Sequence, residues 1–302
     1  MPSSILTAAG LLKVAGLLAC LVPGVAAAAA TPDPARQDIL VDRASPPGLV
    51  ELTIPSDGAL MNGHLYTANG PGPHPTVVFL HGFPGNEKNL DLAQAVRRAG
   101  FNVLYFHYRG AWGSGGAYSI KHILEDARAA VRFVRDAGAA GAHKIDPARV
   151  SLFGHSLGGF NALMTGADDN QITCTVAAAS ANLVRFVEGA DPEAVVSAAA
   201  SAPVPGLDGY SYGDLVRETR ENATAFSLES KMSAFGARPV LIVSGEHDSV
   251  VSMASQMPLG AAAETAGVSN YQHLVMDADH SFSWNRISFS VAVTGWLTDN
   301  CQ

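Results

Sequence analysis

Short apolar runs alternate with helix-like stretches along most of the chain. The strand-like runs are 76–80, 102–107, 149–153, 172–178, 239–244 and 271–276, and the helix-like stretches are 90–99, 121–137, 157–166, 253–266 and 285–298. Strands that are apolar throughout and alternate with helices are typical of parallel sheets with both faces covered. The pattern therefore predicts an α/β fold with a mainly parallel sheet that helices cover on both faces.

Two further segments modify this pattern. The runs "LVELTIP" and "LMNGHLYTA" precede the alternation and are joined by a turn signal at 56–58, which predicts a pair of strands. Residues 181–236 separate two predicted strands and hold helix-like pieces beside the turn-rich "SAPVPGLDGY". Because a structureless loop of that length is rare in a compact domain, we expect a helical lid inserted over the carboxyl edge of the sheet.

The first thirty residues are typical of a signal peptide. They contain one base, Lys13, and no acid, and an apolar run at 14–22 precedes an alanine string with an A-x-A-like cleavage site near Ala28 or Ala30. The apolar run is shorter than the roughly 18–20 residues of a membrane-spanning helix, so a membrane anchor is the weaker alternative.

Lipidation at Cys20 is another alternative to simple export. Leu18 is bulky and the residues after Cys20 stay apolar, which makes a poor lipoprotein box. We therefore expect a secreted or periplasmic protein with no stable membrane span after signal removal. A proline-rich leader at 31–48 would precede one catalytic domain at 49–302.

Composition and charge narrow the possible functions. The 302 residues are 48% hydrophobic and 15% charged, which allows a large core. The formal charge of −8 becomes −9 when Lys13 leaves with the signal peptide, and an acidic chain without a basic patch argues against nucleic acids and anionic membranes as partners. No C-x-x-C or H-E-x-x-H motif occurs and the ten histidines lack ligand spacing, so neither a metal nor another cofactor is expected.

The stretch "RVSLFGHSLGGFNAL" at 149–163 brackets Ser156 with Gly154 and Gly158, between a predicted strand and a predicted helix. Gly-x-Ser-x-Gly alone is a weak signal, with a chance of roughly one in ten in a chain of this length. Its strand-to-helix setting is that of a nucleophile elbow, in which the serine is held at positive φ and side chains two positions away would collide with backbone. The turn exposes the hydroxyl, and the helix that begins at Leu157 directs its first amides toward it.

From about residue 49 to the end, the chain resembles the α/β-hydrolase family. The elbow matches the family's nucleophile motif, the loop at 81–83 its oxyanion loop, and Asp248 and His280 stand where the family has its acid and base. "HGFPGNEKN" and "FHYRGAWGSGGAYS" most resemble prolyl-oligopeptidase catalytic domains, dienelactone hydrolases and cinnamoyl esterases. The resemblance implies serine hydrolase activity in the range from esters to peptides. His107 departs from it, because many members have an acidic or amide residue there.

The same site follows from chemistry. A serine hydroxyl needs an imidazole to take its proton, and the imidazole needs a carboxylate to fix its tautomer. Ser156, Asp248 and His280 occur in the order expected for this fold. The alternatives are His81, His247 and His273 for the base, and Glu246, Asp277 and Asp279 for the acid.

The transition state of acyl transfer needs two backbone N–H donors for its oxyanion. Leu157 supplies one, and we expect Phe83 to supply the other because Pro84 has no N–H. The aromatic residues expected to line the substrate pocket under the lid are Phe186, Tyr210, Tyr212 and Phe226. The alternative is a place in the core, where such aromatic residues lie more often than in a pocket.

After export, Cys174 and Cys301 are the two remaining cysteines. Cys174 begins a predicted strand and Cys301 ends the last predicted helix. Because helices run antiparallel to strands in βα repeats, both lie at the same end of the sheet, which predicts a disulfide. Two separate thiols are the alternative.

These features predict a secreted serine hydrolase that cleaves small carboxylic esters through an acyl-enzyme on Ser156. A serine exopeptidase or amidase would use the same triad. No large domain that could screen peptides precedes the core, which favours the ester. A non-catalytic binding module of the same fold is a third hypothesis, disfavoured because nucleophile, base and oxyanion loop are all present. The oligomeric state and natural substrate stay open.

Overall fold

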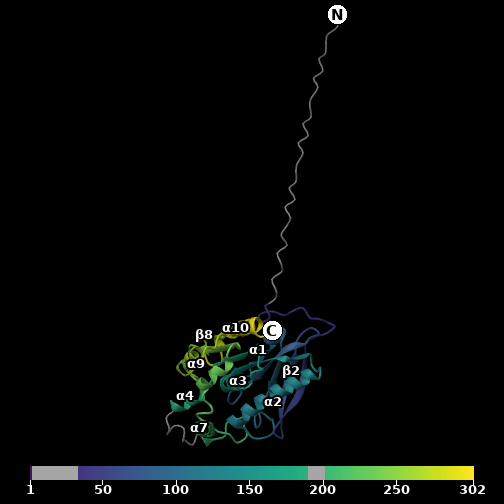
Figure 1. Cartoon of the computed structure of the whole chain (residues 1–302). Helices are drawn as coiled ribbons and strands as arrows, with labels where there is room; N and C mark the ends of the chain where they lie inside the picture. Colours follow the sequence, from purple (N-terminus) through teal and green to yellow (C-terminus); the bar gives the residue numbers. More distant parts are fainter. Residues whose placement is uncertain (2–32, 190–200) are drawn as a thin grey trace. The chain divides into compact units, whose positions relative to one another are not determined.

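The computed structural model describes residue 1, residues 33–189 and residues 201–302 (Figure 1). The predicted signal peptide, with Lys13, Cys20 and the cleavage sites, therefore lies outside the described residues. The strands are β1 (Gly48–Ser56), β2 (Ala59–Thr67), β3 (His74–Leu80), β4 (Asn102–Phe106), β5 (Ile145–His155), β6 (Thr175–Ala178), β7 (Val240–Gly245) and β8 (Tyr271–Met276).

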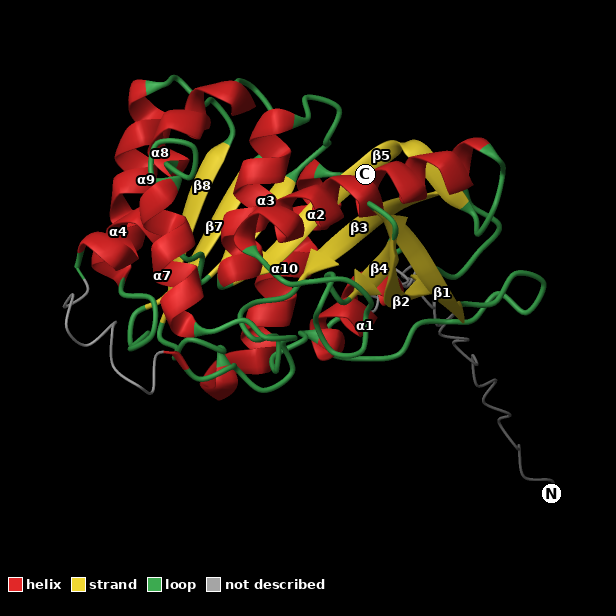
Figure 2. Ribbon diagram, turned by 90° about the horizontal axis from the view of Figure 1, so that it is seen from below, coloured by secondary structure: helices red, strands yellow, loops and turns green. Residues whose placement is uncertain are grey.

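All eight strands form one sheet in the order β1-β2-β4-β3-β5-β6-β7-β8 (Figure 2). The strand β2 is antiparallel to both β1 and β4, whereas all pairs from β4 to β8 are parallel. The predicted strand pair at the start and the mainly parallel sheet are thus confirmed. Parallel pairing brings the carboxyl ends of β5, β7 and β8 to one edge of the sheet.

Helices cover both faces of the sheet (Figure 2). One face carries α1 (Leu90–Arg98) and α10 (Arg286–Asn300), and the other carries α2 (Ile120–Ala139), α3 (Leu157–Asp168) and α9 (Met253–Thr265). Each face has its own apolar cluster. On the first, Val96 of α1 and Val293 of α10 are fully buried, and on the second, Val134 of α2 and Leu163 of α3 are. The predicted two-sided covering is confirmed.

The strand predicted at 271–276 is confirmed as β8, but it is less buried than the strands inside the sheet. Leu274 of β8 is 36% exposed and Val275 is 43% exposed. The reason is the position of β8 at the end of the sheet order, where it pairs with β7 alone among the described strands. By contrast, every residue of β4, inside the sheet, is buried.

The described part of the predicted lid contains four short helical elements. They are α4 (Leu183–Glu188), α7 (Tyr212–Glu221), α8 (Leu228–Lys231) and the 3₁₀ helix η1 (Met232–Phe235). The helices α4 and α7 pack on each other, whereas α8 and η1 pack on α3 and α9 with Leu228, Met232 and Phe235 buried. The end of the insertion, α8 and η1, therefore belongs to the helical layer that covers the sheet. The role of the insertion as a lid stays a prediction.

The two cysteines predicted to pair do so in the structure. Cys174, just before β6, forms a disulfide with Cys301 at the end of α10, and their Cα atoms are 5.8 Å apart. Both residues are buried. The bond joins the end of α10 to the start of β6, a strand inside the sheet.

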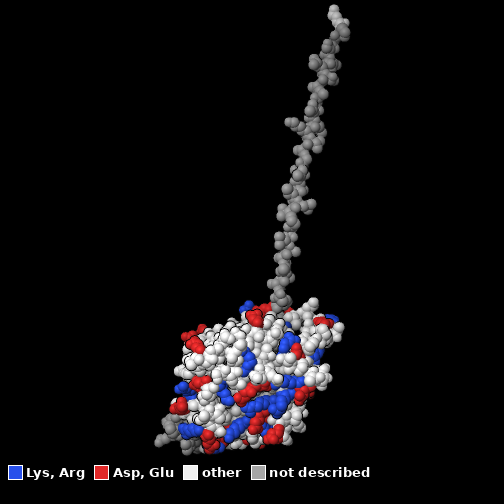
Figure 3. Space-filling model, in the orientation of Figure 1, with Lys and Arg blue, Asp and Glu red and all other residues white. Residues whose placement is uncertain are grey.

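Charged side chains of both signs lie next to one another on the face shown in Figure 3. Among the ion pairs of the structure, Arg128 and Arg135 of α2 pair with Asp168 and Asp169 at the end of α3. Among the described residues, every helix is too short or too polar to cross a lipid bilayer.

Candidate active site

Three predicted site residues meet at the carboxyl edge of the sheet. Ser156 lies between β5 and α3, Asp248 follows β7, and His280 follows β8. The Nε2 atom of His280 is 3.1 Å from Ser156 Oγ, and its Nδ1 atom is 2.8 Å from Asp248 Oδ2. Because a carboxylate only accepts, Nδ1 donates to Asp248 and leaves Nε2 free to accept the serine proton. We call these three side chains the hydrogen-bonded row.

The turn at Ser156 has the conformation that the elbow motif predicts. Ser156 has φ 59° and ψ −121°, outside the regions that residues with side chains prefer. A Cβ atom at Gly154 would overlap the carbonyl group of Gly158, and one at Gly158 would overlap that of Leu80. The backbone is fixed by a hydrogen bond from Ser156 N–H to Ala178 O, 2.9 Å long. Glycine at both positions therefore lets α3 begin directly beside the strand ends.

The carboxylate of Asp248 is fully buried. Its Oδ1 atom accepts hydrogen bonds from the N–H groups of Val250 and Val251, at 2.8 and 2.7 Å, while Oδ2 faces His280. Two backbone N–H donors on one oxygen fix the orientation of the carboxylate. The loop after β7 therefore holds an acceptor against His280.

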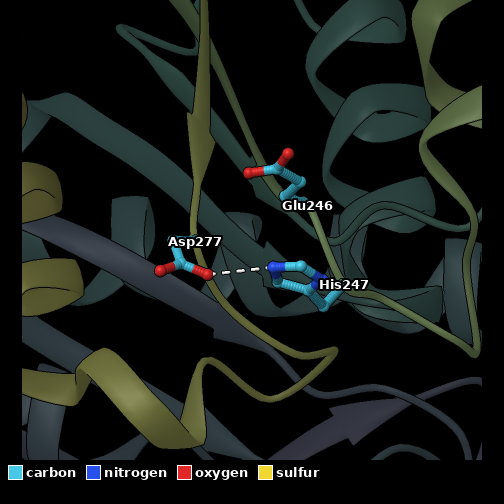
Figure 4. Close-up of side chains that lie close together, drawn as sticks. All are labelled: Glu246, His247 and Asp277. Carbon is cyan, nitrogen blue, oxygen red and sulfur yellow. Dashed lines mark ion pairs between the residues drawn. The ribbon is translucent and has the colours of Figure 1, made fainter.

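The other acids considered from the sequence lie elsewhere. Asp277 pairs with His247, whose Nε2 atom is 3.0 Å from the carboxylate, and Glu246 lies beside this pair (Figure 4). Asp279 accepts a hydrogen bond from Ser283 N–H at 2.6 Å. Asp248 is thus the acid that the structure brings to His280.

Glu246, His247 and Asp277 form an exposed group of ligand-type side chains within 4.8 Å of one another, the one such group of three among the described residues. Sequence spacing does not reveal it because two loops supply its members. The His247 ring also lies 5.4 Å from that of Trp284. We assign no metal role to this group, because exposed acidic side chains beside a histidine are common on protein surfaces and His247 already pairs with Asp277.

The two remaining candidate bases also have other partners. His273 Nε2 lies 2.8 Å from Ser244 Oγ within the sheet. His81 is buried, and burial lowers its pKa to about 4, so the ring is neutral. Its Nδ1 atom donates to Gly82 O at 2.8 Å.

The bond from His81 orients the loop that precedes Pro84. The peptide between Gly82 and Phe83 is trans, so a carbonyl held on the side of His81 leaves the Phe83 N–H pointing the opposite way. A Cβ atom at Gly82 would come within 3.0 Å of Ser156 Cβ, which shows how closely this loop approaches the serine. The loop that contains Phe83 therefore lies next to Ser156, and Leu157 follows Ser156 as the first residue of α3. That the N–H groups of Phe83 and Leu157 bind an oxyanion stays a prediction.

The aromatic residues predicted for the substrate pocket lie in three different surroundings. The rings of Tyr210 and Tyr212 lie 6.1 and 5.1 Å from that of Phe83, in the loop after β3. Phe186 is exposed on α4. Phe226 requires a correction: it is buried and packs on Phe160 of α3 at 5.6 Å, so it belongs to the core, because the chain there has already joined the helical layer.

Two residues near the site were not singled out for it from the sequence. Trp112 donates from Nε1 to Pro84 O at 2.7 Å and so holds the loop that begins at His81. His155, the residue before Ser156, bonds to the loop of His280. His107 is the residue that departs from the family pattern. Its ring packs on those of His81 and Trp112, and burial lowers the pKa of His107 to about 3.

The sheet order, the elbow between β5 and α3, and the row at the sheet's edge define an α/β-hydrolase fold. The sequence pattern of the prolyl oligopeptidase family matches residues 89–302, more than two thirds of the chain. The chain belongs to this family.

Individual proteins show more distant similarity. An uncharacterized protein of Mycobacterium tuberculosis is 32% identical over 130 residues, 43% of this chain and 43% of that protein, so the match spans less than half of the relative. Est1E of Butyrivibrio proteoclasticus, solved with ferulic acid bound, superposes with a TM-score of 0.66 at 19% identity and covers 82% of this chain and 98% of its own. An esterase of Pyrococcus furiosus has a TM-score of 0.64 at 17% identity, with 84% and 93% covered. At these identities the structures show the shared fold.

Proposed function

We propose that this chain is a secreted serine hydrolase that cleaves small carboxylic esters through an acyl-enzyme on Ser156. The observation that carries the proposal is the hydrogen-bonded row, with His280 between Ser156 Oγ and the buried carboxylate of Asp248. In such a row the imidazole can take a proton on one nitrogen while the carboxylate stabilises the resulting imidazolium from the other.

The reaction follows from this geometry. Ser156 Oγ attacks the ester carbonyl as His280 Nε2 takes its proton, and the oxyanion accepts hydrogen bonds from the N–H groups of Phe83 and Leu157. His280 then protonates the departing alkoxide, which leaves the acyl group on Ser156. Water attacks this acyl-enzyme with His280 again as base, and the carboxylic acid is released with the serine restored.

Esters are favoured over peptides as substrates. The ligand of Est1E is a carboxylic acid, and the similar protein of Pyrococcus furiosus is an esterase. Membership of the prolyl oligopeptidase family supports the alternative, a serine exopeptidase or amidase with the same residues. Export is supported by the disulfide between Cys174 and Cys301, since such bonds persist mainly in oxidising compartments.

The test is kinetic. The mature protein is assayed on nitrophenyl esters of increasing acyl length beside aminoacyl nitroanilides, and its serine is labelled with a fluorophosphonate probe. We expect labelling at Ser156 and ester turnover well above that of the anilides. A preference for nitroanilides would replace the esterase with the peptidase, and a protein that neither labels nor turns over would be a binding module.

A further inference from the structure

His155, the residue before the proposed nucleophile, is bonded to the main chain of the proposed base. His155 is the last residue of β5 and is 3% exposed. Its Nε2 atom lies 2.8 Å from the backbone oxygen of His280, 125 residues away in the sequence, and the two rings are 4.9 Å apart. A carbonyl oxygen only accepts, so His155 donates this bond from a protonated Nε2.

The surroundings of His155 keep this donor neutral. Burial is the main reason that its pKa is lowered to about 4, and a positive charge on the neighbouring His280 or Arg286 lowers it further. The backbone bond to His280 and the charge of Asp248 act in the opposite direction and only partly compensate. His155 therefore stays an uncharged donor at the pH values at which serine hydrolases act, while His280 exchanges its proton.

Other bonds hold the loop on both sides of His280. The Ala278 carbonyl accepts from the N–H of His247 at 3.0 Å, and the Ser281 carbonyl accepts from the guanidinium of Arg286 at 2.8 Å. Among the described residues, His155 is the group bonded to the carbonyl of residue 280 itself. It is also the neighbour of Ser156 and is fixed in the sheet by pairing with Ala178 of β6.

We propose that His155 is a positioning residue that sets the distance between Ser156 Oγ and His280 Nε2. This inference rests on the proposed function. One end of β5 carries the nucleophile and, one residue earlier, the donor that holds the base, so a single rigid strand end fixes both partners of the proton transfer. Without this donor, the loop after β8 can shift, and displacements of about 1 Å at a reacting pair cost on the order of 100-fold in rate.

The experiment compares three variants of the mature protein. His155→Phe keeps a ring and removes the donor, His155→Gln restores an N–H donor on an uncharged side chain, and His273→Phe is the control, since His273 also bonds through its ring but away from the row. We expect kcat on nitrophenyl acetate to fall about 10- to 100-fold in His155→Phe with KM changed less than about threefold. His155→Gln should recover much of this loss, and His273→Phe should keep kcat within about threefold.

A spectroscopic readout separates this inference from the proposed function. The Nδ1 proton of His280, bonded to Asp248, should give a far-downfield proton resonance that Asp248→Asn abolishes. We expect His155→Phe to broaden or shift this resonance and His155→Gln to retain it, whether or not esters are substrates. An unchanged resonance and kcat in His155→Phe would overturn the inference, as would an equal loss in the Gln and Phe variants. Absence of ester turnover in the unaltered protein would overturn the proposed function alone.

Discussion

Ser156 occupies a backbone conformation that is unfavourable for any residue with a side chain. Conformations such as its φ of 59° and ψ of −121° cost about 1–3 kcal/mol and persist where the surroundings enforce them. Here the enforcement comes from hydrogen bonds to Ser156 and from the two glycines of the elbow. The strained conformation places the Ser156 hydroxyl 3.1 Å from His280 Nε2. The backbone conformation is therefore locally unfavourable, but it orients the oxygen that the proposed reaction uses.

Ser156→Ala should abolish turnover without unfolding the protein. The loss of the only proposed nucleophile should lower kcat by about 10⁴-fold or more. Because Ala removes a single oxygen and leaves the backbone unchanged, the melting temperature should match that of the unaltered protein. Ester kinetics and thermal unfolding check this. Substantial remaining activity would mean that another residue is the nucleophile.

Asp248→Asn should keep the fold and lower kcat by on the order of 10⁴-fold, because an amide favours the wrong imidazole tautomer. Glu246→Gln is the matched control: it makes the same chemical change two residues away, at an exposed position beside His247. Its kcat should stay near that of the unaltered protein. The reverse pattern, a normal Asp248→Asn and an inactive Glu246→Gln, would contradict our assignment of the acid.

At the scale of elements, the site is formed by the loops that follow β5, β7 and β8. A disulfide bond joins two neighbouring elements, β6 and α10. The Cys174–Cys301 disulfide connects β6 to α10 across a separation of 127 residues. Crosslinks over long separations reduce the entropy of the unfolded chain most in the loop-closure description. The helix α10 begins with Arg286, which also bonds to the loop of His280. The disulfide therefore stabilises an element that contacts the site.

Cys301→Ser should lower the free energy of unfolding by about 2–5 kcal/mol. Cys174→Ser should have a similar effect and the double variant should add little, since each change breaks the same bond. Denaturant unfolding of the three variants measures this. The bond itself is checked by mass spectrometry of the unreduced, alkylated protein, in which two alkylated cysteines would refute it.

For the whole molecule, the buried histidines link stability to pH. His81 and His155 are both buried, and burial lowers the pKa of each to about 4 from the ordinary histidine value of 6.5. In the folded protein they stay neutral between these values, whereas in the unfolded chain they bind protons below pH 6.5. Their contribution to stability is therefore complete above about pH 6.5 and decreases as pH falls toward 4.

We expect the free energy of unfolding to fall as pH decreases from 6.5 to 5, with a slope that approaches about 1.4 kcal/mol per pH unit for each of these two histidines at the lower end of this range. Urea unfolding at several pH values measures the slope. His155→Gln, which cannot take up a proton, should reduce the slope by the share of one histidine. A free energy of unfolding that is constant from pH 7 to 5 would show that these rings are not neutral and buried in the folded protein.

Much of this architecture could be predicted from the sequence. Apolar runs and helix-like stretches predict the parallel sheet and its two covered faces, because burial on both sides of a strand is visible in its composition. The elbow at Ser156 is partly local, since its positive φ and the clash at Gly154 arise within five residues, whereas the clash at Gly158 involves Leu80 of β3. Ser156, Asp248 and His280 also occur along the chain in the order that is expected for the fold these elements predict.

Contacts between distant residues required the tertiary structure. Asp248 and Glu246 are two positions apart and chemically similar, and only the path of the loop after β7 places the amides of Val250 and Val251 behind the carboxylate of Asp248. Phe226 is an aromatic residue of the insertion, as a pocket residue would be, but it is buried against Phe160 of α3. The bond from His155 to the carbonyl of His280 has no sequence signature, because any residue offers a carbonyl and only packing decides which one a buried donor reaches.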